Sequence, residues 1–316
     1  MTAASYTPSR AIPAEDIRKW DLETDVAIVG FGIAGACAAI EARMAGAAVT
    51  IFEVAAAAGG SSAMSGGEFY IGGGSETQKA AGFDDTIDDF RAYLTMASGP
   101  GVDQPRVDRY AENGLEHLEW LAKQGVPFKG TYLPGRWPEP PTDDTLIWCG
   151  SETAWPFRDV AKPAPRGHTA QAVGRGGGQM VMDRLSGRAL ALGVEAHFSA
   201  RALCLIVGRA GDVLGLVVRI DGEPRMVRAR NGVILASGGF IANPDMLQQY
   251  APRVLGINSY PITGGNDDGS GIRMGQSVGG ALTHMEQFFA TRTTFPPESL
   301  IKGIIVNEQG QRFINQ

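Results

Sequence analysis

The chain has 316 residues, a net charge of −6 and no run of Lys or Arg. This length can bury a substantial core in one large domain or two ordinary ones. An acidic chain without a basic patch does not favour nucleic acid or an anionic membrane as a partner. The 43 glycines gather in short loops without a repeat period, which argues against a collagen or low-complexity chain.

Cysteines and apolar runs indicate an ordinary intracellular chain. Cys37, Cys149 and Cys204 are too few and too far apart to predict a disulfide or zinc framework. The N-terminus lacks the basic segment and apolar core of a signal peptide. The longest apolar run, residues 26–40, contains three glycines and is too short to span a bilayer. We therefore expect a cytoplasmic protein without a membrane span or a bound metal.

After a loose arm over residues 1–22, the first predicted elements are a strand, a glycine turn and a helix. The buried strand 26–29 leads into Gly30, Gly32 and Gly35, which match the pattern G-x-G-x-x-G. In such a unit the first glycine allows a tight turn, the second lets the backbone approach a pyrophosphate, and the third lets the helix pack on the strand. Unpaired N–H groups at the start of the helix attract the phosphates.

A second buried strand, residues 49–52, ends in an acid. Glu53 lies 23 residues beyond Gly30, where a carboxylate can accept hydrogen bonds from an adenosine ribose. A glycine triplet alone could belong to a purely structural strand–helix–strand unit. Because both strands, the helix and the acid are present, the pattern favours dinucleotide binding.

A second glycine cluster, residues 59–67, follows only six residues later and reads GGSSAMSGG. Small residues let backbone N–H groups come within hydrogen-bond distance of the polar edge of a flavin, and serine hydroxyls can reach a phosphate or the ring. The alternative is a flexible surface loop. The pairing of this cluster with the first glycine pattern favours a flavin.

The middle of the chain predicts helices and one long excursion. Asp84 and Asp85 can cap a helix that runs to about Met96, and apolar residues at helical spacing predict another helix over 107–121. Residues 133–166 are rich in Pro and Trp and predict a long irregular segment, of a kind that is often functional. The glycines 174–178 open a further helix, which extends to Leu192.

The last third predicts a meander and further glycine turns. We expect meander strands over residues 202–207, 213–220 and 225–229, then a buried strand over 233–236, a helix over 272–281 and a strand pair within 303–315. The chain ends inside the last of these elements at Gln316, which predicts a truncated protein or a fragment.

Together these segments resemble one flavoprotein superfamily. It contains the soluble fumarate reductases, the succinate dehydrogenase flavoprotein and the 3-ketosteroid dehydrogenases. The resemblance rests on the two glycine clusters, the strand end 236–239, the Asp268-Gly269 turn and the closing segment 306–313. It implies an α/β fold: a Rossmann-like FAD-binding domain over 1–280, with a parallel sheet, a meander and a helical, Pro-rich insertion at about 76–168. Residues 281–316 would begin a truncated α+β cap domain for substrate.

The resemblance also implies which residues contact FAD. Ala202 would lie near the adenine, while Ala236, Gly238 and Asp268 would surround the pyrophosphate or ribityl chain. Asp268 taken alone would be read as a turn-former. The full implied set is Gly30, Gly32, Ala34, Gly35, Glu53, Val54, Gly60, Ser61, Ser62, Ser65, Gly66, Gly67, Ala202, Ala236, Gly238 and Asp268.

Two departures from the family pattern bear on how FAD is attached and on which class of substrate fits. Members that attach FAD covalently carry a His in the serine–glycine loop, whereas residues 61–64 here have none, so we expect non-covalent FAD. Fumarate reductases present a His for a dicarboxylate after the segment that resembles 279–285. This chain has residues 286–290, EQFFA, there. Phe288 and Phe289 suit an apolar ligand, unless they are plain core residues.

Within the superfamily, the segments 154–168 and 176–182 resemble the 3-ketosteroid dehydrogenase branch, and most of all the enzymes that desaturate the 4,5 position of ring A. His168 could be a polar contact near the flavin, but a structural histidine is the favoured reading. Arg166 and Arg175 could likewise be either polar contacts near the flavin or structural residues.

The resemblance implies that a tyrosine removes the α proton of the ketone and that flavin N5 accepts a hydride from the β carbon. The catalytic tyrosine is expected beyond Gln316, and Tyr70, Tyr132 and Tyr260 are read as structural, so no catalytic residue is assigned. The expected substrate is a small apolar ketone, a steroid, and the electron acceptor is unknown. The alternatives are a reductase of an unsaturated acid and a non-catalytic FAD-binding fragment.

Overall fold

The computed structural model describes residues 7–137, 140–256, 261–289, 304 and 306–312. The chain divides into two compact units. The first contains residues 1–65 and 181–288, and the second contains residues 66–180 and 289–316. Each unit has its own β-sheet.

The first unit is built on a seven-stranded sheet in the order β1-β9-β10-β11-β2-β3-β8. Strands β11, β2, β3 and β8 are mutually parallel, whereas β9, β10 and β11 form an antiparallel meander. The bounds are β1 Ile12–Pro13, β2 Leu22–Val29, β3 Val49–Phe52, β8 Glu195–His197, β9 Arg201–Val207, β10 Val213–Ile220 and β11 Glu223–Leu235. The predicted α/β class, with a parallel sheet and a meander, is confirmed.

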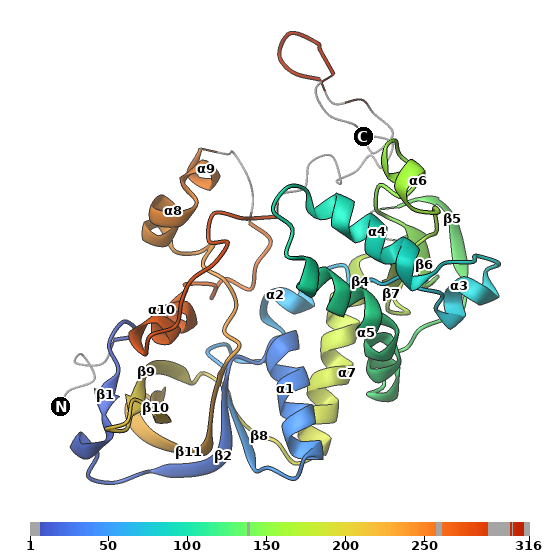
Figure 1. Ribbon diagram of the computed structural model, residues 1–316. Helices are drawn as coiled ribbons and strands as arrows, with labels where there is room; N and C mark the ends of the chain where they lie inside the picture. The colour runs from blue at the N-terminus through green and yellow to red at the C-terminus, as the bar shows by residue number, and fades with distance from the viewer. Residues whose placement is uncertain (1–6, 138–139, 257–260, 290–303, 305, 313–316) are drawn as a thin grey trace. The chain divides into compact units, whose positions relative to one another are not determined.

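Helix α1 (Ile33–Met44) explains why β2 ends in the apolar run 26–29 and why β3 is buried. It packs against β2 and β3 (Figure 1), and all four residues of β3 are buried. Strands covered on both faces are continuous apolar runs rather than alternating ones. Helix α10 (Ser270–Ser277) packs against β9 and β11, where Met274 joins the main core cluster.

Strand β11 corrects one sequence prediction. The predicted strands 225–229 and 233–236 are parts of one strand, Glu223–Leu235. Its first part pairs antiparallel with β10, and its register against β2 shifts between Ala229 and Gly232. Arg230, Asn231 and Gly232 look like a loop in the sequence because this irregularity interrupts the apolar pattern.

The remaining helices of the first unit are short. They are α2 Gly60–Ala63, α8 Pro244–Tyr250 and α9 Pro252–Leu255, with a 3-10 turn at Ala14–Asp16. Helix α7 (Gly177–Ala191) crosses the boundary between the units. Among the described residues, no helix combines the length and apolar character that a bilayer crossing requires.

The second unit holds a four-stranded sheet in the order β4-β7-β6-β5. Its bounds are β4 Glu68–Tyr70, β5 Tyr132–Arg136, β6 Leu146–Trp148 and β7 Gly167–Thr169, and its helices are α3 Glu76–Ala80, α4 Ile87–Ser98, α5 Gln104–Lys123 and α6 Phe157–Val160. The predicted irregular segment 133–166 is irregular over most of its described residues, but the prediction missed the short elements β5, β6 and α6. Its strands have three to five residues, too few to display a period.

Helix α4 begins later than predicted. Thr86 is its N-cap and accepts a hydrogen bond from the Asp89 N–H. Asp84 and Asp85 precede the cap, and Asp85 is buried in an ion pair. In the closing segment, Val306 and Arg312 form an antiparallel bridge around the Gln309-Gly310 turn, and Phe313 lies outside the described residues.

Candidate functional site

A cavity of about 610 Å³ opens at the carboxyl ends of the parallel strands of the first unit. β2, β3 and β11 end at Val29, Phe52 and Leu235, and the residues that follow each strand line the cavity. Open α/β sheets bind ligands at this edge. The cavity wall includes most of the predicted cofactor contacts, namely Gly30, Gly32, Ala34, Glu53, Val54, Gly60, Ser61, Ser62, Ala202, Ala236, Gly238 and Asp268.

The first glycine turn brings backbone to the cavity at close range. Gly30 has φ +100°, and a Cβ there would lie 2.5 Å from the Ala236 carbonyl oxygen. A Cβ on Gly35 would lie 2.0 Å from the Gly30 carbonyl oxygen, so Gly35 serves packing beneath the turn and does not line the cavity. Gly32 is the N-cap of α1 and offers no side-chain cap. Among the first-turn N–H groups, which a helix cannot satisfy itself, the Ile33 N–H donates to Ser62 Oγ, and Ala34 lines the cavity beside it.

Glu53 is held in a fixed orientation at the end of β3. Its side chain is buried, and its two oxygens accept hydrogen bonds from the Phe31 N–H at 2.6 Å and the Ala55 N–H at 2.8 Å. An ionised carboxylate can accept about four hydrogen bonds. Each Glu53 oxygen therefore keeps acceptor capacity for a ligand hydroxyl.

The two serines of α2 have different partners. Ser61 Oγ donates to Asp267 Oδ2 at 2.5 Å and accepts from the Gly264 N–H at 2.9 Å. Ser62 Oγ accepts from the Ile33 N–H in the first turn of α1 at 3.1 Å. Both serines line the cavity.

Three other predicted residues do not line the cavity. Ser65 Oγ donates to the Ser62 carbonyl oxygen at 2.8 Å. Gly66 and Gly67 belong to the second unit, where a Cβ on Gly67 would lie 2.2 Å from the Gly177 carbonyl carbon. Contacts of these residues with a cofactor stay predictions.

Two residues that line the cavity, Arg201 and Asp268, form an ion pair. Arg201, beside the predicted adenine contact Ala202, donates to Asp268 Oδ2 at 2.7 Å. Burial works to raise the pKa of Asp268, but hydrogen bonds from Arg201 and Ser270 outweigh it and hold that pKa below its ordinary value. Arg201 and Asp267 were not among the predicted contacts. No local pattern marks either residue, because their partners are distant in the chain.

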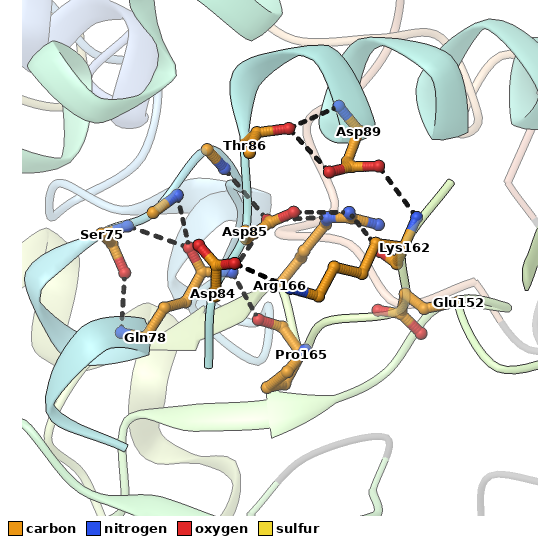
Figure 2. Close-up of polar contacts among 12 residues, drawn as sticks. Ser75, Gln78, Asp84, Asp85, Thr86, Asp89, Glu152, Lys162, Pro165 and Arg166 are labelled. Atoms are coloured by element: carbon orange, nitrogen blue, oxygen red, sulfur yellow. Dashed lines mark hydrogen bonds and ion pairs between the residues drawn. The ribbon is translucent and has the colours of Figure 1, made fainter. Parts of the chain in front are cut away.

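The second unit buries a charged cluster around Arg166 (Figure 2). Arg166 is fully buried, and its Nε and Nη2 donate to the two oxygens of Asp85 at 3.0 Å and 2.7 Å. Gln78 Nε2 bridges Asp85 and the Pro165 carbonyl oxygen. These contacts join α3 and the segment before α4 to the segment that leads into β7, so Arg166 has a structural role in this unit.

His168 also has structural partners. Its ring is fully buried, with Nε2 2.7 Å from Ser75 Oγ and Nδ1 3.1 Å from the Arg166 carbonyl oxygen. Burial lowers the pKa of His168 to about 4, so the ring is neutral near pH 7. The favoured structural reading of this histidine agrees with its geometry.

The two described tyrosines that were considered as bases have side-chain partners within the second unit. Tyr70 donates to Glu152 Oε1 at 2.8 Å, and burial raises its pKa far above the ordinary value. Tyr132 accepts from Trp148 Nε1 at 2.7 Å, and Tyr260 lies outside the described residues. Within the described ranges, no group of three or more His, Cys, Asp or Glu side chains is arranged to hold a metal.

Phe288 and Phe289 are 42% and 92% exposed, so the reading of these two residues as plain core was wrong. Ala290, the last residue of that segment, is outside the described residues.

Comparison with known proteins agrees with this geometry. Residues 25–316 match the protein family described as FAD binding domain. The chain is 31% identical to the 3-oxo-5-alpha-steroid 4-dehydrogenase of Comamonas testosteroni, over 96% of this chain and 65% of that protein.

Two solved structures extend the comparison. The 3-ketosteroid-delta4-(5alpha)-dehydrogenase of Rhodococcus jostii RHA1, in complex with 4-androstene-3,17-dione, is 40% identical with a TM-score of 0.90, over 96% of this chain and 64% of that one. An open flavocytochrome c3 fumarate reductase is 25% identical with a TM-score of 0.68, over 82% of this chain and 41% of that one. The chain thus spans less than two thirds of the length of each of these relatives.

Proposed function

Since the chain belongs to the FAD binding domain family, we propose that it forms the cofactor site of an FAD-dependent dehydrogenase that desaturates ring A of a 3-ketosteroid. The observation that carries the proposal is the cavity at the carboxyl edge of the parallel strands, in a chain 40% identical to a 3-ketosteroid-delta4-(5alpha)-dehydrogenase. Activity is proposed for the protein that contains this chain.

The donor and acceptor groups of the cavity fit FAD. The first turn of α1, whose N-cap is Gly32, offers backbone N–H groups and the positive end of the helix dipole to a pyrophosphate. Glu53 offers acceptor positions to ribose hydroxyls. Among the residues that the structure describes, Arg201 is the one cation that lines the cavity, and Asp268 already engages it, so backbone N–H groups would carry most of the phosphate recognition.

The chain's own residues would bind and orient the cofactor. Gly30 and Gly32 bring main chain to the phosphates, and Glu53 fixes the adenosine end. The absence of His from residues 61–64 supports non-covalent attachment. When bound, FAD supplies the acceptor of the hydride that leaves the carbon β to the ketone.

A steroid substrate is supported by the names of the relatives that match over almost the whole chain. Phe288, exposed at the end of the first unit, supplies apolar surface compatible with such a ligand. Tyr70 and Tyr132 contact Glu152 and Trp148, so neither is proposed as the catalytic base.

A fumarate reductase-like activity is the second candidate, because a fumarate reductase matches over 82% of the chain. A dicarboxylate needs cationic partners, whereas residues 286–289 present an acid, an amide and two phenylalanines. This composition favours the ketone over the dianion.

An anaerobic flavin-reduction experiment tests the proposal. The protein that contains this chain is loaded with FAD and mixed with a saturated 3-ketosteroid without oxygen, and the absorbance of the oxidised flavin is followed. We expect bleaching with the steroid. Parallel reactions start from chemically reduced flavin and receive fumarate or an acrylate. An oxidised spectrum that persists with every 3-ketosteroid, or re-oxidation by the unsaturated acid alone, would contradict the steroid assignment.

A further inference from the structure

Asp267 connects segments of the cavity wall that are far apart in the sequence. We propose that Asp267 is a positioning residue that holds α2, the turn after β11 and the 263–269 loop together, and so pre-forms the cofactor cavity. This inference rests on the proposed function, because the wall that Asp267 holds is the wall of the proposed FAD site.

The contacts of Asp267 reach all three segments. From α2, Ser61 Oγ donates to Asp267 Oδ2 at 2.5 Å. Thr263 Oγ1, at the start of the loop, donates to the same oxygen. The Gly239 N–H, in the turn after β11, donates to Oδ1 at 3.2 Å. One carboxylate therefore ties together segments whose sequence numbers differ by up to 206.

The glycines around this carboxylate have the geometry that the contact requires. A Cβ on Gly238 would lie 2.3 Å from Asp267 Oδ1, and Gly238 also has φ +80°. A Cβ on Gly264 would lie 2.9 Å from the Gly60 backbone. Any side chain at these positions would push the loop away from α2 or from the turn, so the close approach depends on glycine on both sides.

An ionised carboxylate also fixes the direction of the neighbouring hydroxyl hydrogens, because it only accepts hydrogen bonds. Ser61 must donate to Asp267, and its oxygen already accepts from the Gly264 N–H. The Ser62 oxygen likewise accepts from a backbone N–H, that of Ile33, but its hydrogen is not directed to Asp267 and is available to a ligand oxygen. Of the two adjacent serines, Ser61 holds the wall and Ser62 faces the phosphates.

Amide hydrogen exchange of the cofactor-free chain tests the connection directly. We expect Asp267→Ala to accelerate exchange at Gly239 and Gly264 by about 10-fold or more, since their N–H groups lose a partner or the Ser61 oxygen that Asp267 orients. Asp245→Ala, an exposed aspartate of the same unit, is the matched control and should leave both amides unchanged. Unaltered exchange at both amides in Asp267→Ala would overturn the proposal.

A second variant covers the case in which Asp267→Ala does not fold. In Asp267→Asn the remaining oxygen can still accept from the Gly239 N–H. The amide nitrogen takes the place of the oxygen that accepts from Ser61 and Thr263, and this nitrogen can only donate. We expect Gly264 to exchange faster in this variant and Gly239 to stay near the wild-type rate. Equal protection of both amides in Asp267→Asn and the wild type would overturn the role of the carboxylate.

Titration with FAD separates the two serines. Ser61→Ala and Asp267→Ala should each weaken FAD binding about 10-fold, and the double variant should be no weaker than Asp267→Ala alone, because both changes break one contact. Ser62→Ala should weaken binding without altering exchange at Gly264. Wild-type affinity in Asp267→Ala, or multiplying effects in the double variant, would contradict the positioning role. A wild-type chain that binds no FAD would refute the proposed function, and the exchange data would still decide whether Asp267 holds the three segments together.

Discussion

Glu53 shows how one buried side chain links the sequence pattern to the cofactor site. Its place after β3 is readable from the sequence, since it follows a four-residue buried strand. Its orientation is not, because the N–H group that holds one of its oxygens belongs to Phe31, 22 residues earlier in the chain.

We expect Glu53→Gln to weaken FAD binding by about 10- to 100-fold, since a hydrogen bond to a charged group is lost and the new amide N–H groups oppose the Phe31 or Ala55 N–H. Glu116→Gln, on the exposed face of α5, is the control. Quenching of flavin fluorescence on titration measures both affinities. Equal affinity in the two variants would show that Glu53 does not contact the cofactor.

His168 gives stability a specific pH dependence. Its folded-state pKa of about 4 lies below the ordinary value of 6.5, so the unfolded chain binds the proton more readily. The stabilisation is complete above about pH 6.5 and is lost as the pH falls toward 4. The two values correspond to on the order of 3 kcal/mol.

We therefore expect the free energy of unfolding to fall more steeply between pH 7 and pH 4.5 in the wild type than in His168→Gln. Urea unfolding at each pH gives both slopes. The carboxylates titrate equally in the two proteins. The difference between the slopes therefore measures the contribution of the His168 imidazole. Parallel slopes would mean that the buried ring is not neutral in the folded state.

At the scale of elements, two helical glycines differ in whether their surroundings leave room for a side chain. In α1, a Cβ on Gly35 would lie 2.0 Å from the Gly30 carbonyl oxygen, whereas a Cβ on Gly187 in α7 would meet nothing within 4 Å. We expect Gly35→Ala to destabilise the chain by about 3 kcal/mol and Gly187→Ala to stabilise it by about 0.5–1 kcal/mol. Thermal unfolding measures both changes. Similar melting temperatures for the two variants would contradict the close approach of α1 to the glycine turn.

The two aspartates before α4 make a second matched pair (Figure 2). Asp85 pairs with Arg166 where both side chains are fully buried, whereas Asp84 pairs with Lys162 at the surface. Asp85→Ala leaves a buried guanidinium without its carboxylate and should cost about 3–5 kcal/mol. Asp84→Ala should cost about 0–1 kcal/mol. Chemical unfolding distinguishes the two, and a small loss in Asp85→Ala would show that Arg166 finds other partners.

The elements that the sequence predicts well are those whose signal is local. The strand–turn–helix–strand unit from β2 to β3 and the meander strands carry complete apolar patterns within a few residues. The second sheet escapes prediction because β6 and β7 have three residues each and depend on pairing across about 20 residues of chain. The continuity of β11 through Asn231 comes from its two different neighbours, which no local pattern contains.

At the scale of the molecule, the same distinction applies to the site. Gly30, Gly32, Ser62 and Glu53 could be proposed from motifs near one another in the chain. Arg201 and Asp267 could not, since their roles come from partners 67 and 206 residues away. Family resemblance added Ala202, Ala236, Gly238 and Asp268, which the fold brings to the wall of one cavity.

The central claim is that the cavity at the edge of the parallel strands binds FAD without a covalent bond. The most direct test purifies the chain, incubates it with FAD, removes free cofactor, and analyses the acid-released ligand by chromatography and mass. We predict intact FAD in a ratio near one per chain (about 1:1 for a single site), fully released by acid and lost in Gly35→Ala. No bound flavin, a flavin that stays attached to the denatured chain, or a nicotinamide nucleotide in its place would contradict the account.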